Sequence, residues 1–122
     1  MIQELKQNLG GEERVFTFGL TFLGNVLERL DFDYNELLLK SSKNPFKYAP
    51  ILMYESLNNT AAKTGDKVDF TENDLIEWLE NEETFGADKI VEFIHVFMGT
   101  NENKTPVENS EPITDSKSVK KK

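Results

Sequence analysis

Apolar residues recur at helical spacing along most of the chain. After Gly19 they fall at i, i+1, i+4, i+5 and i+8, at Phe22, Leu23, Val26, Leu27 and Leu30. This spacing places them on one face of a helix. Comparable stripes predict further helices from Asp33 to Asn44, from about Tyr48 to Gly65, from Thr71 through Leu79, and from Ala87 to Met98.

Capping signals mark the ends of two of these helices. Asp33 precedes Glu36 by three residues, which is the spacing of a capping box, and Asn44-Pro45 is expected to end that helix. Thr71 is a favourable N-cap, and the acidic residues that follow it suit the positive end of a helix dipole.

Proline and glycine set the remaining helix boundaries. Pro50 fits the first turn of a helix that begins near Tyr48, because the N–H that proline lacks has no intrahelical partner there. Gly65 is expected to stop this helix and Gly99 to stop the last one.

The first 18 residues differ from this pattern. Gly10-Gly11 predicts a turn, and the β-branched and aromatic run over residues 14–18 predicts a short strand. Before the turn, Ile2, Leu5 and Leu9 at i, i+3 and i+7 favour a short helix. The sequence as a whole predicts a mainly α fold of four to five helices with one or two short N-terminal β-strands.

The length and the distribution of apolar residues predict one domain and a tail. A chain of 122 residues is expected to form one domain with a modest core. Residues 99–122 contain no aromatic residue, so they offer too little apolar surface to offset the entropy of ordering them. We therefore predict an acidic helical domain over residues 1–98 and a disordered polar tail over residues 99–122.

The net charge belongs to the predicted domain. The chain carries a formal net charge of −8, with −9 in residues 1–98 and +1 in residues 99–122. A strongly negative domain is repelled by a phosphate backbone and by an anionic membrane surface, so neither nucleic acid nor membrane is expected as a partner. The chain has no signal-peptide pattern and no apolar run of membrane-spanning length, which favours a soluble cytosolic protein.

Catalytic, metal and cofactor signals are weak. Asp66 and Glu77 have the spacing of the first and last ligands of an EF-hand loop, but Val68 and Phe70 occupy positions where oxygen ligands are required. The chain has no cysteine, and its only histidine, His95, has no catalytic constellation around it. We expect no enzymatic activity, no metal and no cofactor, and we interpret the carboxylates of residues 72–83 as a solvated helix face.

The aromatic content is high for a domain of this size. Nine Phe, three Tyr and one Trp are difficult to bury completely in about 98 residues, and an exposed apolar patch usually marks an interaction site. Most of these residues are expected in the core. Phe46, Tyr48 and Phe85, near predicted helix ends, are expected at the surface, and the sequence leaves Trp78 undecided.

The order of elements resembles one family of viral proteins. A strand segment Val15-Phe16-Thr17-Phe18-Gly19-Leu20-Thr21-Phe22-Leu23 runs into a helix, Tyr54-Glu55-Ser56-Leu57 lies on a central helix, and an acidic stretch spans residues 70–80 before a closing helix and a polar tail. Over most of residues 12–98 this order resembles the tail assembly chaperones of long-tailed, siphophage-type bacteriophages. The resemblance also favours a strand, in place of a helix, before Gly10.

The resemblance implies a non-enzymatic protein of the infected bacterial cytoplasm. Members of that family bind and solubilise the tape-measure protein, help to recruit tail-tube protein and are absent from the mature virion. The residues at matching positions that we expect to contact a partner are aromatic: Phe16, Phe18, Phe22, Trp78, Phe93 and Phe97. All six are equally compatible with core positions, and a homo-oligomer is compatible with the sequence.

Three alternatives and one feature of the gene remain open. The chain fits a small head–tail or tail-completion protein of the virion, or an acidic inhibitor that mimics nucleic acid; an enzyme comes last. Lys120-Lys121-Lys122 must be encoded by A-rich codons, which fits the ribosomal frameshift that the family uses to extend some copies.

Overall fold

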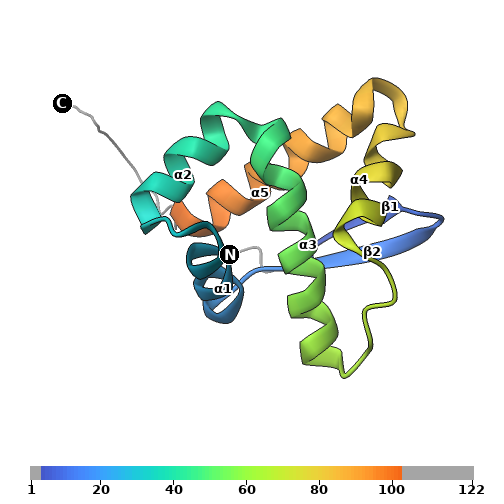
Figure 1. Cartoon of the computed structure of the whole chain (residues 1–122), viewed down its shortest axis with the longest axis horizontal. Coiled ribbons are helices and arrows are strands. Elements are labelled where there is room, and N and C mark those ends of the chain that lie inside the picture. Colours follow the sequence, from blue (N-terminus) through green and yellow to red (C-terminus); the bar gives the residue numbers. More distant parts are fainter. Residues whose placement is uncertain (1–3, 103–122) are drawn as a thin grey trace.

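The computed structural model describes residues 4–102 of the 122-residue chain (Figure 1). It begins with an antiparallel hairpin of β1 (Glu4–Leu9) and β2 (Glu12–Thr17). Five α-helices and one 3-10 helix follow within the described residues: α1 (Leu20–Leu30), α2 (Tyr34–Lys43), α3 (Pro45–Thr64), α4 (Glu72–Glu80), η1 (Glu83–Gly86) and α5 (Ala87–Glu102). The prediction of a mainly α fold with short N-terminal strands is confirmed.

The hairpin replaces the short helix favoured by the spacing of the first apolar residues. Leu5 pairs with Phe16 and Leu9 with Glu12, and Gly10 and Gly11 have φ of 64° and 84°. Positive φ at both central residues is typical of the type I′ turn, which matches the twist of the strands in a hairpin with a two-residue loop. Gln7 and Leu9 are buried, so the buried positions alternate along β1. A glutamine at one inward position concealed this strand period in the sequence.

Two predicted helix boundaries are wrong. α3 begins at Pro45, three residues before the expected start, because the proline that stops α2 also occupies the first turn of α3. Pro50 is therefore inside the helix. α5 continues through Gly99 to Glu102, since an isolated glycine costs a helix only about 1 kcal/mol. Residues 103–122 of the predicted tail lie outside the described residues.

The predicted caps at the other helix ends are confirmed. The backbone N–H of Glu36 donates to the Asp33 carboxylate at 2.7 Å. Thr71 and Asp74 exchange side-chain and backbone hydrogen bonds in a capping box at the start of α4. Gly65 ends α3 in the left-handed conformation, with φ of 80°.

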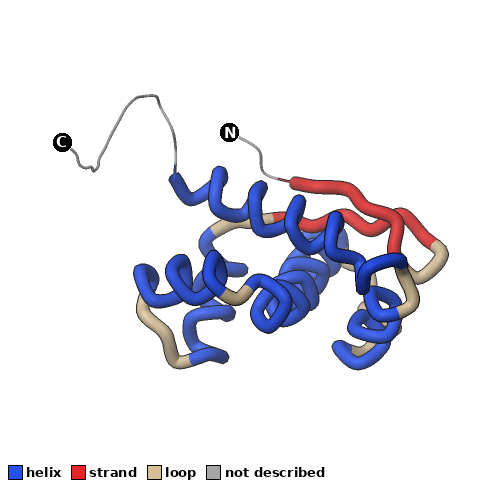
Figure 2. The backbone as a smooth tube through the Cα atoms, turned by 90° about the horizontal axis from the view of Figure 1, so that it is seen from above, coloured by secondary structure: helices blue, strands red, loops and turns tan. Residues whose placement is uncertain are grey.

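The core lies around α3, which packs against β2 and against the other four α-helices (Figure 1). Figure 2 shows the hairpin alongside α5, on one side of the molecule. Between these elements five fully buried phenylalanine rings pack with centroids 5.3–6.4 Å apart, at Phe16, Phe18, Phe22, Phe93 and Phe97. No helix within residues 4–102 is long and apolar enough to cross a membrane.

Candidate functional site

The structure places five of the six aromatic residues expected at a partner interface inside the core. Phe16, Phe18, Phe22, Phe93 and Phe97 are at most 2% exposed. Their rings pack edge-on or tilted against one another, the arrangement that aromatic quadrupoles favour in a packed interior. These five side chains have no surface to offer a partner in the folded protein.

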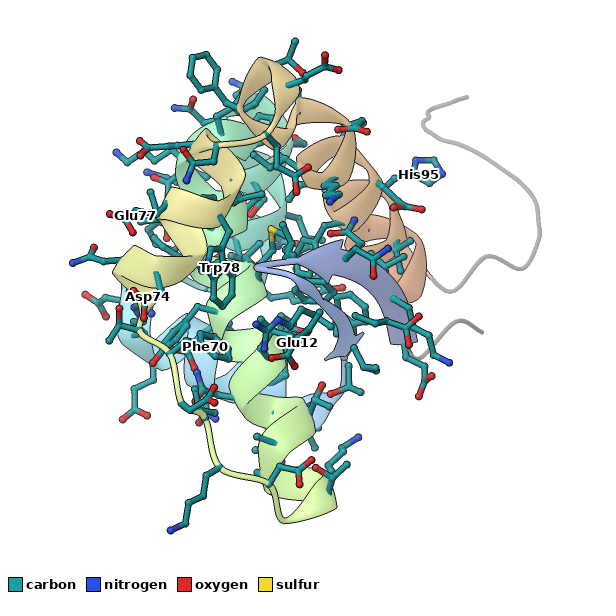
Figure 3. The ribbon with its side chains drawn as sticks, turned by 90° about the vertical axis from the view of Figure 1, so that its right-hand side faces the viewer. Glu12, Phe70, Asp74, Glu77, Trp78 and His95 are labelled. Carbon is teal, nitrogen blue, oxygen red and sulfur yellow. The ribbon has the colours of Figure 1, made fainter. Side chains whose placement is uncertain are left out.

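Trp78, the sixth, is half-buried and fixes the hairpin to α4. Its ring lies 4.5 Å from the guanidinium carbon of Arg14 and 5.2 Å from the ring of Phe70. The backbone of Gly10 also lies directly against the indole. Figure 3 shows Trp78 between α4 and the tip of the hairpin, with Phe70, from the loop before α4, below it. This tryptophan is therefore largely occupied by contacts within the domain.

The exposed aromatic residues lie elsewhere. Phe46 is 54% exposed and Phe85 is 67% exposed, as the sequence predicts, but Tyr48 is buried. The prediction for Tyr48 is wrong because α3 starts earlier than expected. Tyr48 consequently falls inside the helix, where its ring packs edge-on against Phe32 with centroids 5.8 Å apart.

Phe46 and Phe85 both line an apolar groove of about 320 Å³. The groove is formed by the start of α3, the second half of α4, η1 and the start of α5, in the upper half of Figure 1. Leu79 and Ile90 are buried beneath it. Its lining residues are Phe46, Pro50, Ile76, Leu79, Glu80, Phe85 and Ile90, of which only Glu80 is polar.

The loop that carries Phe85 has an unusual backbone. Thr84, Phe85 and Gly86 have φ of 51°, 59° and 70°. Left-handed φ costs a non-glycine residue about 1–2 kcal/mol, and residues held in this way cluster at functional sites. The turn packs closely against Leu79 at Gly86, where a Cβ would lie 2.8 Å from Cδ2 of Leu79. The missing side chain of glycine allows this approach.

Hydrogen bonds hold this loop in place. Lys89 Nζ lies 2.7 Å from the Glu82 carboxylate and also donates to the backbone carbonyl of Asn8 in the hairpin. The side-chain amide of Gln7 donates to the Lys89 carbonyl at 3.0 Å. Lys89 therefore links the hairpin to the turn before Phe85, and the groove wall is attached to the rest of the domain.

The groove lies in the most acidic part of the domain. Residues 72–89 contain seven carboxylates and one basic residue, Lys89. Glu72 binds Arg29 at 2.7 Å, and this hydrogen bond is the main reason that the pKa of Arg29 is raised above its ordinary value. Asp74 caps α4 and Glu82 binds Lys89, so the predicted solvated face is only partly solvated.

Four other carboxylates of this segment face solvent. Glu77, Glu80, Glu83 and Asp88 are exposed, and none of them belongs to an ion pair between residues that the structure describes. Lys43 and Lys47 flank Phe46 in the chain. The α4–η1 side of the groove is thus negative, whereas Lys43 at the end of α2 and Lys47 at the start of α3 are positive.

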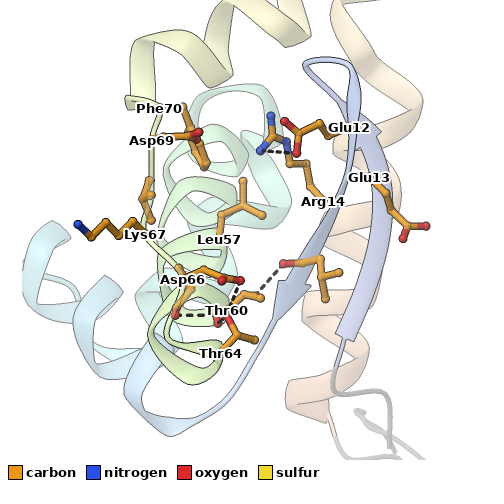
Figure 4. Close-up of a pocket in the computed structure, with 13 residues that line it drawn as sticks. Glu12, Glu13, Arg14, Leu57, Thr60, Thr64, Asp66, Lys67, Asp69 and Phe70 are labelled. Atoms are coloured by element: carbon orange, nitrogen blue, oxygen red, sulfur yellow. Dashed lines mark hydrogen bonds and ion pairs between the residues drawn. The ribbon is translucent and has the colours of Figure 1, made fainter.

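A second cavity, of about 370 Å³, lies between β2, the C-terminal half of α3 and residues 66–70 (Figure 4). Its polar groups bond mainly to one another. The Thr60 hydroxyl donates to the Val15 carbonyl at 2.7 Å, and the Thr64 hydroxyl donates to the Asp66 carboxylate at 2.9 Å. These bonds attach α3 and the following loop to the domain.

The remaining titratable candidates are dispersed. His95 is exposed on α5, and Figure 3 shows it on the far side of that helix from Asp74 and Glu77. Asp66 lies in the loop after α3 and Glu77 lies on α4. Within residues 4–102, no three His, Asp or Glu side chains come together in a way that could hold a metal ion. The apolar groove is therefore the candidate functional site.

Most residues beneath the groove are ordinary members of helix stripes, which is why the sequence does not distinguish them from core. Ile76, Leu79 and Ile90 were all expected on apolar helix faces. The signal that could identify the site is Phe85, an aromatic residue within the polar run between two helices. Comparisons with protein-family models, with curated proteins and with solved structures found no match to this chain.

Proposed function

We propose that this protein is a non-enzymatic tail assembly chaperone of a long-tailed bacteriophage that binds the tape-measure protein in the apolar groove. The observation that carries the proposal is the pair of exposed rings, Phe46 and Phe85, that line this groove. Exposed apolar surface bordered by polar residues marks a protein interaction site. The order of elements that resembles this chaperone family supports the choice of client.

The groove fits the apolar face of a helix. In helix-in-groove recognition, apolar side chains at i, i+3 or i+4, and i+7 enter a hydrophobic channel. A long helical client exposes such side chains along its whole length and aggregates unless they are covered. A small protein that covers them and adds a formal net charge of −8 keeps the complex soluble.

The protein works in the cytoplasm of the infected bacterium, helps to bring tail-tube protein to the covered tape-measure protein, and leaves before the particle is complete. Its charge opposes binding to nucleic acid.

Co-expression with the tape-measure protein of the same phage tests the proposal. The soluble fraction of the tape-measure protein should rise with the wild-type chain and fall back with Phe85→Ser or Phe46→Ser. Leu20→Ser is the matched control, because Leu20 is an 87% exposed apolar residue on α1 and does not line the groove. A tape-measure protein that is no more soluble with the wild-type chain than without it would overturn the proposal.

Mass spectrometry of purified particles separates this function from a structural one. A chaperone is absent from the finished virion, whereas a head–tail or tail-completion protein remains in it. Recovery of the chain in stoichiometric amount from particles would favour the structural role.

A further inference from the structure

Carboxylates lie on one side of the groove, and this uneven distribution of charge affects which partner binds there. Glu80 lines the groove on α4, and Glu83 opens the 3-10 helix that carries Phe85. Both carboxylates are exposed and lack an ion-pair partner among the described residues. An apolar segment that enters the groove brings its flanking side chains close to Glu80, and Glu83 lies two residues before the lining residue Phe85.

Resting on the proposed function, we infer that the client segment is an amphipathic helix with Lys or Arg beside its apolar stripe, on the edge that meets Glu80 and Glu83. Exposed carboxylates at the margin of a groove favour a positive partner and disfavour a negative one, and they contribute more to specificity and association rate than to affinity. The apolar contacts with Phe46 and Phe85 supply most of the affinity.

A second copy of this chain is a poorer occupant of the groove. Each copy carries a formal net charge of −8, so two copies repel each other at low ionic strength. Glu80 is also the single polar side chain that lines the groove. A partner with a continuous apolar stripe therefore fits better than one whose surface mixes polar and apolar residues. A basic amphipathic helix satisfies both conditions.

Three synthetic peptides of about 18 residues, long enough for partial helix formation, test the inference on the full-length protein. They share one Leu stripe and differ only beside it, where they carry Lys, Gln or Glu. Fluorescence anisotropy should give the order Lys, Gln, Glu from tightest to weakest, with about a tenfold difference in Kd between Lys and Glu peptides. The difference should disappear near 1 M salt, where the Debye length is about 3 Å.

Matched charge variants show whether the preference is local. Glu80→Gln with Glu83→Gln should weaken binding of the Lys peptide by about threefold to tenfold and leave the Gln peptide within about twofold. The control is Glu13→Gln with Glu28→Gln, which removes the same charge from exposed positions on β2 and α1. A control that weakens the Lys peptide equally would mean that only the total charge matters, and it would overturn the inference.

The outcomes distinguish this inference from the proposed function. If all three peptides bind equally and Phe85→Ser abolishes binding, the groove is the client site but the basic partner is wrong. If no peptide binds and Phe85→Ser leaves the solubility of the tape-measure protein unchanged, both are wrong. If sedimentation shows a dimer that Phe85→Ser dissociates, the groove is a contact between copies and the inference is overturned.

Discussion

The backbone of Gly10 at the hairpin turn lies against the indole of Trp78 on α4, so closely that a Cβ at Gly10 would lie 2.4 Å from Cε2 of the tryptophan. Real Cβ atoms do not approach other atoms so closely. With φ of 64°, Gly10 also has a backbone conformation that costs other residues about 1–2 kcal/mol. The turn and the helix can pack together only because the side chain is absent.

Gly10→Ala should therefore lower the free energy of unfolding by about 2–4 kcal/mol, the sum of left-handed strain and overpacking against Trp78. Urea denaturation measures the loss. Gly11→Ala is the matched control, because Gly11 has φ of 84° and nothing lies within 4 Å of a Cβ there. It should lose only about 1–2 kcal/mol. Equal losses in the two variants would contradict the proposed contact with Trp78.

The phenylalanines divide into a structural group and a surface group, and the two should respond differently to truncation. Phe93→Ala removes a fully buried ring that packs 5.3 Å from Phe16 and 5.4 Å from Phe18. It should cost about 3–5 kcal/mol, a large part of the stability of a small domain.

Phe46→Ala serves as the comparison, since its ring is more than half exposed. It should change the free energy of unfolding by less than about 1 kcal/mol. Thermal unfolding followed by circular dichroism measures both variants. A loss at Phe46 as large as that at Phe93 would mean that the groove is part of the core and not a binding surface.

Local signals in the sequence predicted much of the fold. Helix stripes located the five α-helices of the described residues, and Asp33, Thr71 and Gly65 end or begin them as predicted. These features depend on residues that are close in the chain. The spacing of the apolar residues alone favours a helix over β1, because Gln7 occupies a buried position of the strand. Its amide nitrogen donates to Lys89 and Glu92 on α5, more than 80 residues away.

The same local signals predicted only part of the candidate site. Phe46 and Phe85 were recognised as surface residues from their position near helix ends. Phe16, Phe93 and the other core phenylalanines contribute to the same high aromatic content, which does not distinguish a buried ring from one on a contact surface. Only the packing between distant elements shows that they are buried. The groove itself depends on how α3, α4 and α5 meet, which no local pattern contains.

Arg29 joins α1 to two other helices, through Glu55 on α3 at 3.0 Å and Glu72 on α4 at 2.7 Å. Because its side chain is about one-third exposed, solvent reduces the contribution of this bridge, and Arg29→Gln should cost only about 0.5–1 kcal/mol.

The pKa of Arg29 is raised, chiefly by the hydrogen bond to Glu72. A raised pKa on a basic group gives stability that is fully present below the unfolded value and is lost only as the pH rises through the folded value. The difference in Tm between wild type and Arg29→Gln should therefore stay constant between about pH 6 and about pH 9. A difference that shrinks with rising pH in this range would contradict this assignment.

The left-handed turn before α5 predicts a conflict between stability and binding. Thr84 is exposed and has φ of 51°, and its hydroxyl donates a hydrogen bond to the adjacent Glu83 carbonyl. Thr84→Gly removes the strain of a β-branched residue in this conformation and should raise the free energy of unfolding by about 1 kcal/mol. Thr21→Gly, at an exposed position in α1, should instead lower it by about 0.5 kcal/mol.

The same change should weaken binding in the groove, because glycine lets the turn that positions Phe85 sample other conformations. Binding of the Lys peptide to Thr84→Gly should fall by about twofold to fivefold while stability rises. Urea denaturation and anisotropy on the same preparation measure the two effects together. If Thr84→Gly stabilises the protein and binds the peptide as well as the wild type does, the strained turn is not part of the recognition site.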